Sequence, residues 1–216
     1  MLDWNKINTV LLDMDGTLLD LNFDNHFWLE FVPQHYAELK QLSLIEAKEI
    51  LLPLFKSMEG RLEWYCLDYW SEQLNLDIAG LKTEISGLIT ILPHVTEFLS
   101  ALQSSDKKVF LVTNAHPDSL SLKMEKTCLQ PFFDDIICSH HFGFAKEHQP
   151  FWLAFQEQYA WDKQSTLMVD DSLAVLRAAR TFGIQHLMAM SKPDSQKMGR
   201  NISEFSAVSD FRAIMP

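Results

Sequence analysis

The chain has 216 residues, of which 47% are hydrophobic and 22% are charged. This length allows one large domain, or one domain with a smaller insertion, and a sizeable core. The 18 basic and 29 acidic residues give a net charge of −11. That charge disfavours nucleic acid as a partner, because nucleic-acid affinity rests mostly on lysine and arginine contacts to phosphates. A single small phosphorylated ligand stays compatible with it, since such a ligand needs only a local positive site.

The three cysteines, Cys66, Cys128 and Cys138, are scattered and include no CxxC spacing. They therefore indicate neither a disulfide framework nor a zinc–thiolate site, and they fit a reducing compartment. The N-terminal residues lack the basic and apolar regions of a signal peptide, and no apolar run reaches the roughly 18 residues that a membrane span requires. We expect a soluble cytoplasmic protein with no membrane partner.

Short apolar runs alternate with amphipathic helical patterns along most of the chain. A continuous apolar run predicts a strand buried on both faces, and strands separated by helices are typical of parallel sheets. The predicted strands are residues 9–12, 108–112, 135–138, 166–169 and 185–190. The predicted helices are residues 95–103, 118–127, 149–159 and 173–182, the last of them ended by Gly183. The pattern predicts an α/β fold with a doubly wound parallel sheet.

The interval from residue 21 to residue 92 has no convincing strand and contains several helical stretches in succession. Its sequence "SLIE", residues 43–46, is a capping box that opens one helix. Residues 62–74 are predicted as a second helix, and Asp77 is placed to cap a third. We expect a separate small helical domain at residues 21–92, seated over the sheet. Residues 1–20 and 93–216 would then form the α/β core.

Polar and charged side chains follow the predicted strands. In open α/β sheets, ligands bind outside the carboxyl ends of the strands, so these side chains share one edge. The first strand is followed by "DMDGT", in which two carboxylates stand one residue apart. If the extended geometry continues, both side chains point the same way. Burying two like charges together is costly unless a cation is present. The strand-end side chains are Asp13, Asp15, Thr113, Asn114, Lys146, Asp170 and Asp171.

Carboxylates, a hydroxyl and an ammonium at one edge support phosphoryl transfer through a covalent aspartyl phosphate. A carboxylate nucleophile attacks phosphorus only if the charge of the phosphate is offset, which Mg²⁺ on oxygen ligands and a nearby lysine would do. A second carboxylate must protonate the leaving oxygen and later deprotonate the attacking water. The strand ends supply every one of these parts.

In their order along the chain, "DMDGT", Thr113, Lys146 and "VDDS" resemble the four motifs of the haloacid dehalogenase superfamily. The resemblance covers essentially the whole chain, with the helical insert in the place of that superfamily's C1 cap, and it implies a Rossmann-like core. It implies that Asp13 is the nucleophile and that Asp15 is the general acid and base. Thr113 and Lys146 would hold the phosphoryl oxygens, and Asn114 is placed with them in the substrate site.

The same resemblance implies a Mg²⁺ ion bound by the Asp13 side chain, the Asp15 backbone carbonyl and an acid of the fourth motif. Asp171 aligns with the acid in the commoner "GDS" form of that motif and is the first candidate. Asp170 stands where many relatives have glycine, so it is either a second or water-mediated ligand or a cap of the following helix. The dehalogenase branch carries a non-acidic residue at the position of Asp15, so this acid indicates a phosphatase or phosphomutase.

Segments such as "DLNFDNHFW" and "HFGFAKEHQPFW" look like those of the bacterial GMP/IMP nucleotidases of the superfamily. This resemblance implies a 5′-nucleotidase that hydrolyses purine nucleoside 5′-monophosphates, IMP and GMP, to nucleoside and phosphate. Hydrolysis of another small phosphomonoester, such as a sugar phosphate or phosphoglycolate, is the alternative. A catalytically idle fold used as an interaction module is a further alternative, although no motif acid, hydroxyl or ammonium is missing.

Aromatic side chains are dense in residues 62–74, and their helical spacing divides them into two faces. Trp64 and Asp68 fall together on one face and are the candidates for contacts with the base or the ribose. The inner face of the insert is predicted to hold Leu62, Tyr65, Cys66, Tyr69, Gln73 and Leu74.

Overall fold

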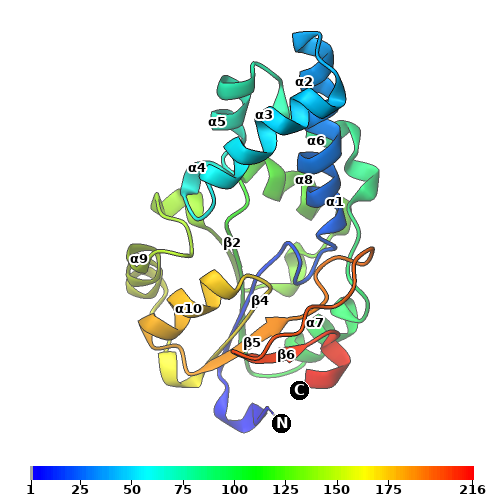
Figure 1. Cartoon of the computed structure of the whole chain (residues 1–216). Helices are drawn as coiled ribbons and strands as arrows, with labels where there is room; N and C mark the ends of the chain where they lie inside the picture. The colour runs from blue at the N-terminus through cyan, green and yellow to red at the C-terminus, as the bar shows by residue number, and fades with distance from the viewer. Residues whose placement is uncertain (1) are drawn as a thin grey trace.

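Six parallel strands form the central sheet of the protein (Figure 1). The structure, a computed structural model, describes residues 2–216, and the strand order is β3-β2-β1-β4-β5-β6. The predicted α/β fold with a doubly wound parallel sheet is confirmed. The last strand was not predicted, because it is a three-residue edge strand with two exposed residues and no apolar run. The strands are β1 Thr9–Leu12, β2 Lys108–Thr113, β3 Asp135–Cys138, β4 Thr166–Asp170, β5 His186–Met190 and β6 Ser206–Val208.

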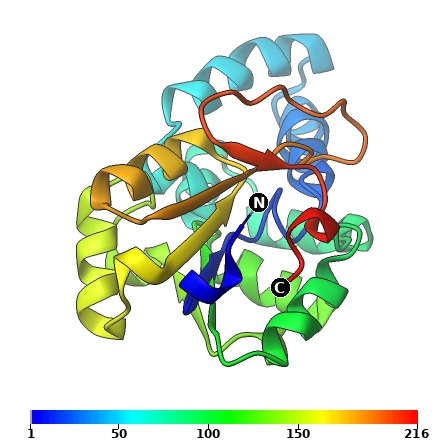
Figure 2. The same cartoon turned by 90° about the horizontal axis from the view of Figure 1, so that it is seen from below.

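The two faces of the sheet pack into separate hydrophobic cores. Val10 and Leu12 of β1 belong to one core and Leu11 to the other, because side chains alternate between faces along a strand. Helices cover both faces, which Figure 2 shows from below the sheet. The covering helices are α7 (Val95–Gln103) and α8 (Pro117–Thr127) on the first face, and α9 (Gln149–Tyr159) and α10 (Leu173–Phe182) on the second.

The named elements between β1 and α7 are all helical. Their apolar side chains form a third hydrophobic cluster, in which Trp70 is fully buried. None of the helices within residues 2–216 is long and apolar enough to cross a membrane. The elements of this helical insert are α1 Asn22–His26, a π-helical turn Phe27–Phe31, α2 Val32–Lys40, α3 Leu44–Ser57, α4 Leu62–Tyr65, α5 Leu67–Leu74 and α6 Ile78–Glu84.

Both helix caps predicted within the insert are confirmed. The backbone N–H of Glu46 donates to Ser43 Oγ at 3.3 Å, and the Glu46 carboxylate accepts from the Ser43 N–H at 2.8 Å, which completes the capping box of α3. Asp77 accepts from the Gly80 N–H at 2.9 Å and caps α6. These caps satisfy backbone donors that the first helical turn leaves unpaired.

The single helix predicted over residues 62–74 is wrong, because the chain breaks it at Cys66. Cys66 has extended backbone angles, φ −84° and ψ 113°, and its sulfur caps the start of α5. The helical phase restarts at this point, so α5 buries Leu67, Trp70 and Leu74. Of the inner face predicted from unbroken spacing, only Leu74 is buried.

The two segments that connect the helical insert to the sheet run side by side. The N–H of Asp20 donates to the Thr90 carbonyl at 2.9 Å, and the N–H of Leu92 donates to the Leu18 carbonyl at 2.9 Å. The chain therefore leaves the sheet and returns to it at one place. Figure 1 shows the insert standing at one end of the sheet.

We predict that Gly183→Ala lowers the free energy of unfolding by about 1–2 kcal/mol, because a Cβ is unfavourable in the left-handed region. Gly183 has φ +103° and ends α10. The measurement is urea denaturation followed by circular dichroism. Gly87→Ala is the control, since Gly87 has no left-handed φ and no atom within 4 Å of its added Cβ. Equal effects of the two substitutions would contradict the assignment of Gly183 as a required helix end.

Candidate active site

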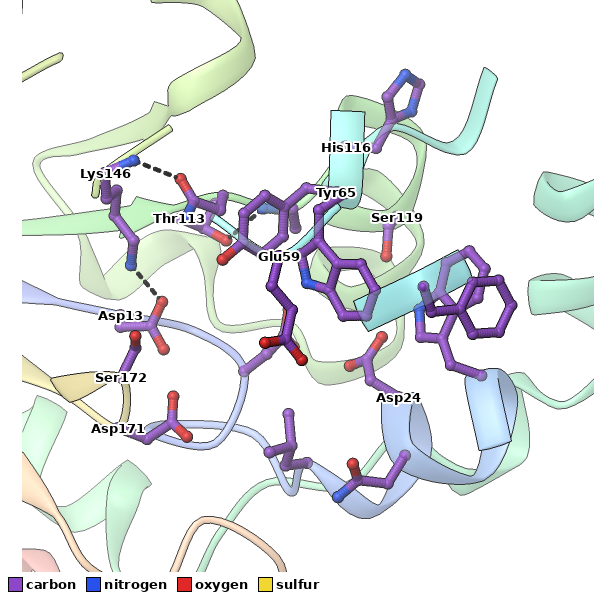
Figure 3. Close-up of a pocket in the computed structure, with 18 of the residues that line it drawn as sticks. Asp13, Asp24, Glu59, Tyr65, Thr113, His116, Ser119, Lys146, Asp171 and Ser172 are labelled. Carbon is purple, nitrogen blue, oxygen red and sulfur yellow. Dashed lines mark hydrogen bonds and ion pairs between the residues drawn. The ribbon is translucent and has the colours of Figure 1, made fainter. Parts of the chain in front are cut away.

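Lys146 is the buried cation at the carboxyl ends of the strands. Its ammonium donates to Asp13 Oδ1 at 2.6 Å (Figure 3), to Asp170 Oδ2 at 2.8 Å and to the Val112 carbonyl at 2.9 Å. Burial alone would lower the pKa of this lysine, but the two carboxylates raise the pKa of Lys146 above its ordinary value. One ammonium thus connects the ends of β1, β2 and β4 with the loop that follows β3.

Three carboxylates converge beside this ammonium. Asp13, Asp170 and Asp171 each offer an oxygen, and these atoms lie within 4.8 Å of one another. Burial and the charge of Asp13 raise the pKa of Asp171 to about 7 and raise the pKa of Asp170 well above its ordinary value. The Oδ2 atom of Asp13 is buried and has no hydrogen-bond partner within residues 2–216. This set of oxygen donors, short of positive charge, fits a divalent cation, and its chemistry suits Mg²⁺.

Asp170 accepts hydrogen bonds from two directions. Its Oδ2 accepts from Lys146, and its Oδ1 accepts from the backbone N–H of Ser172 at 2.8 Å. Ser172 itself caps α10 through its hydroxyl. Asp170 therefore stabilises the start of α10 through the Ser172 N–H and also binds the ammonium of Lys146.

Gly16 packs directly against the carboxylate of Asp171. It has φ +85°, and a Cβ at this position would lie 2.8 Å from Cγ of Asp171. Asp171 also contacts Arg200, whose guanidinium lies 3.5 Å from the carboxylate and donates to the Asp171 backbone carbonyl at 2.7 Å. The glycine in "DMDGT" is thus required both by the turn and by the space that Asp171 occupies.

Thr113 and Asn114 end β2 beside the same group. Thr113 Oγ1 accepts a backbone N–H at 3.0 Å, which leaves its hydroxyl proton available to a ligand. Asn114 accepts from the backbone N–H of Lys146 at 2.9 Å and donates to Glu147 at 2.9 Å. The other oxygen of Glu147 accepts from the hydroxyl of Tyr65 at 2.6 Å. Tyr65 belongs to α4, so these bonds connect the helical insert with the strand end.

Asp15 pairs with a different lysine from the one that pairs with Asp13. Its Oδ1 atom accepts from the ammonium of Lys123, a residue of α8, at 2.7 Å. Burial raises the pKa of Asp15 to about 6, although Lys123 opposes the shift. A carboxyl group with that pKa exchanges a proton readily near neutral pH. The two acids that lie one residue apart in the sequence therefore have separate partners.

A cavity of about 510 Å³ opens above the strand ends and is lined by residues of both the sheet and the insert. Figure 3 shows Tyr65, Glu59 and Asp24 directed toward it from the insert, opposite Asp13 and Asp171. The predicted site residues that line it are Asp13, Asp15, Thr113, Asn114, Lys146, Asp170, Asp171 and Trp64.

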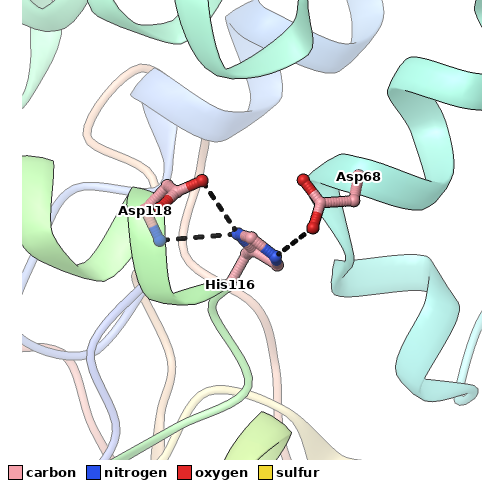
Figure 4. Close-up of side chains that lie close together, drawn as sticks. All are labelled: Asp68, His116 and Asp118. Carbon is pink, nitrogen blue, oxygen red and sulfur yellow. Dashed lines mark hydrogen bonds and ion pairs between the residues drawn. The ribbon is translucent and has the colours of Figure 1, made fainter.

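Asp68 is the predicted site residue that is not brought into this cavity lining. It is exposed, and its carboxylate lies 3.5 Å from Nε2 of His116, whose Nδ1 is 3.6 Å from Asp118 (Figure 4). The helix break at Cys66 separates Asp68 from Trp64, so the two no longer share a face as unbroken helical spacing predicted.

Three cavity residues that the sequence motifs do not include are Lys123, Lys82 and Asp24. The two lysines are buried on helices, Lys123 four residues after the buried Ser119 and Lys82 four residues after the buried Ile78. A lysine on the buried stripe of a helix is a signal that sequence reading could have used, because lysine is almost never fully buried unless it is paired.

The chain is similar in sequence to proteins of known name. It is 40% identical over 213 residues to the GMP/IMP nucleotidase YrfG of Escherichia coli, covering 99% of this chain and 96% of that protein. It is also 27% identical to a phosphoglycolate phosphatase of Agrobacterium fabrum, over 81% of this chain and 76% of that protein.

Solved structures share the fold at lower identity. A HAD phosphatase from Thermococcus onnurineus superposes with a TM-score of 0.79 at 21% identity, and the HAD-hydrolase YfnB of Bacillus subtilis with a TM-score of 0.70 at 20% identity. Each alignment covers 96% of both chains. The sequence profile of the haloacid dehalogenase-like hydrolases matches residues 7–183. The chain belongs to the haloacid dehalogenase-like hydrolases.

Proposed function

We propose that this hydrolase is a Mg²⁺-dependent phosphatase that releases phosphate from purine nucleoside 5′-monophosphates, IMP and GMP. The carrying observation is the pairing of a buried carboxylate, Asp13, with the ammonium of Lys146 at the floor of a cavity large enough for a nucleotide. The full-length relative named for GMP and IMP supports the choice of substrate.

Asp13 is proposed as the nucleophile. Its Oδ1 is held by Lys146, while Oδ2 has no hydrogen-bond partner in the described chain and is thus available to form a bond. In the first step Asp13 bonds to phosphorus as the bond from phosphorus to the 5′ oxygen breaks. Lys146 and the Thr113 hydroxyl offset the charge on the phosphoryl oxygens, and Asn114 fixes the loop that carries Lys146.

Asp15 is proposed to move the proton in both steps. It first donates a proton to the departing 5′ oxygen of the nucleoside. It then removes a proton from the water that attacks the phosphorus of the Asp13 phosphate, which breaks the bond to Asp13 and releases phosphate. The pKa of about 6, raised by burial, suits a group that must be protonated in one step and deprotonated in the next.

A Mg²⁺ ion would be held by the side chains of Asp13 and Asp171, with the Asp15 carbonyl, and with Asp170 as a second or water-mediated ligand. The unpartnered Asp13 oxygen and the three convergent acids support this assignment. When bound, the ion supplies charge neutralisation that lets an anionic nucleophile approach an anionic phosphate.

The helical insert, residues 21–92, is proposed to act as the cap that selects the substrate. Trp28, Phe55 and Trp64 line the cavity on the insert side, and they offer flat apolar surface of the kind on which a purine packs. Trp64 is the proposed base contact. Asp68, whose carboxylate lies beside His116, is not retained as one.

The nucleophile assignment predicts that Asp13→Asn abolishes phosphate release, because the amide nitrogen and the neutral oxygen do not attack phosphorus. Phosphate release from IMP is the measurement, and an unchanged circular dichroism spectrum shows that the fold is retained. Asp3→Asn is the matched control, since Asp3 caps the N-terminal 3₁₀ turn Trp4–Lys6 and does not line the cavity. Full activity of Asp13→Asn would rule out the proposed nucleophile.

Metal removal is expected to silence the enzyme. EDTA treatment should stop hydrolysis of IMP, because the clustered carboxylates of Asp13, Asp170 and Asp171 then lack the cation that offsets their charge and that of the phosphate, and addition of Mg²⁺ should restore the rate. The assay compares Mg²⁺ with Zn²⁺ in the metal-stripped protein. Restoration by zinc alone would be incompatible with a site of hard oxygen donors.

A substrate panel tests the proposed specificity. We expect kcat/KM to be higher for IMP and GMP than for AMP, ribose 5-phosphate and 2-phosphoglycolate. Trp64→Ala should reduce the preference for IMP over ribose 5-phosphate, because the latter has no base to pack against the ring. Highest turnover of phosphoglycolate or a sugar phosphate would instead establish the alternative substrate class.

A further inference from the structure

Four buried or partly buried charges of alternating sign run from Asp15 into the helical insert. Lys123 Nζ lies 2.7 Å from Asp15 Oδ1 and 2.7 Å from Asp24 Oδ2. The other oxygen of Asp24 accepts from Lys82 Nζ at 2.6 Å, and Lys82 also donates to Ser119 Oγ at 3.3 Å. We call Asp15, Lys123, Asp24 and Lys82 the ion-pair chain.

The ion-pair chain joins the sheet region to the insert. Asp15 follows β1 and Lys123 lies on α8, whereas Asp24 lies on α1 and Lys82 on α6. The lysine side chains are 1% and 4% exposed, so both ammoniums are removed from water. Figure 1 shows α1, α6 and α8 grouped at the boundary between the insert and the sheet region.

Stability alone is a poor reason for this arrangement. Taking an ammonium out of water costs several kcal/mol, and well-packed apolar residues of similar volume often do as well or better. Apolar surroundings are already present, because Lys82 and Lys123 both lie over the ring of Phe23, at 5.0 and 5.3 Å from its centroid. The ion-pair chain also ends at Asp15, an acid that lines the cavity. A purely structural cluster would not require such an end.

Lys123 fixes one oxygen of Asp15 and leaves the other open. Oδ1 of Asp15 accepts from Lys123, whereas no hydrogen bond from residues 2–216 reaches Oδ2. Lys123 is itself held in place by Asp24, and Asp24 is held between two ammoniums. Within the ion-pair chain, Lys82 thus orients Asp24, Asp24 orients Lys123, and Lys123 orients Asp15.

We propose that Lys123 is a positioning residue that directs the open oxygen of Asp15 toward the leaving oxygen of the substrate, and that Asp24 and Lys82 of the insert hold Lys123 in that position. This inference rests on the proposed role of Asp15 as proton donor. It makes two insert residues part of the machinery that orients the proton transfer, although neither of them transfers a proton.

The test compares two substrates whose leaving groups differ in their need for a proton. The nucleoside of IMP departs poorly unless its 5′ oxygen is protonated, whereas p-nitrophenyl phosphate releases the p-nitrophenolate anion without a proton donor. The ratio kcat/KM reports only the steps up to the first irreversible one, here the transfer to Asp13. A loss of proton donation should therefore lower kcat/KM for IMP and leave p-nitrophenyl phosphate nearly unchanged.

We expect Lys123→Met to reduce kcat/KM for IMP by about 100-fold, the usual scale for a displaced catalytic group, with a much smaller loss for p-nitrophenyl phosphate. Asp24→Asn, which keeps its shape and loses its charge, should show the same bias with a smaller loss and covers the case in which Lys123→Met does not fold. Lys48→Met is the control, because it removes the exposed ion pair of the insert with Glu30 and should change neither substrate.

Asp15→Asn distinguishes a failure of the proposed positioning role of Lys123 from a failure of the proposed proton-donor role of Asp15. It should lose about 100-fold or more on IMP and little on p-nitrophenyl phosphate, because a general acid contributes on that scale. If Asp15→Asn shows this bias and Lys123→Met or Asp24→Asn lowers both substrates equally, the ion-pair chain is structural only and our inference is overturned. If Asp15→Asn itself shows no bias, the proposed proton donor is wrong, and the inference fails with it.

Discussion

The active-site region depends on one buried ammonium, that of Lys146, placed between Asp13 and Asp170. The ends of parallel strands meet at one edge of the sheet, where Asp13 directly follows β1 and Asp170 ends β4. Burial, and after it the neighbouring charge of Asp13, disfavours the ionised form of these acids and raises the pKa of Asp170 and Asp171. The ammonium offsets part of this cost, and the remaining excess of negative charge suits the region to a divalent cation.

A second carboxylate paired with a buried lysine lies two residues further along the chain, at Asp15. Asp15 also has a buried lysine, but Lys123 comes from α8 and is in turn held by an acid of the insert. Two acids one residue apart are thus paired with lysines from different elements. This separation ties Asp13 to the sheet through Lys146 and ties Asp15 to the helices through Lys123, which gives the two carboxyl groups different surroundings.

The strands and the strand-end residues could be predicted from the sequence because both depend on local signals. An apolar run such as residues 166–169 is buried on both faces wherever it lies in the chain, and the side chains directly after it must reach the carboxyl edge. The break at Cys66 could not be predicted from periodicity, because a single extended residue changes the phase of the helix without changing the composition around it. Lys82 and Lys123 are long-range partners of Asp24, 58 and 99 residues away, and no local pattern encodes such a pairing.

The paired connections at Asp20–Thr90 and Leu18–Leu92 have a further consequence for how the chain folds and diverges. Seen from the sheet, the entire insert is a loop whose two ends are already hydrogen-bonded to each other. The entropy of closing a loop grows only logarithmically with its length, so a longer or shorter insert changes the cost of assembling the sheet very little. The helices above the cavity can therefore be enlarged, trimmed or replaced through evolution while Asp13, Lys146 and Asp171 keep their positions.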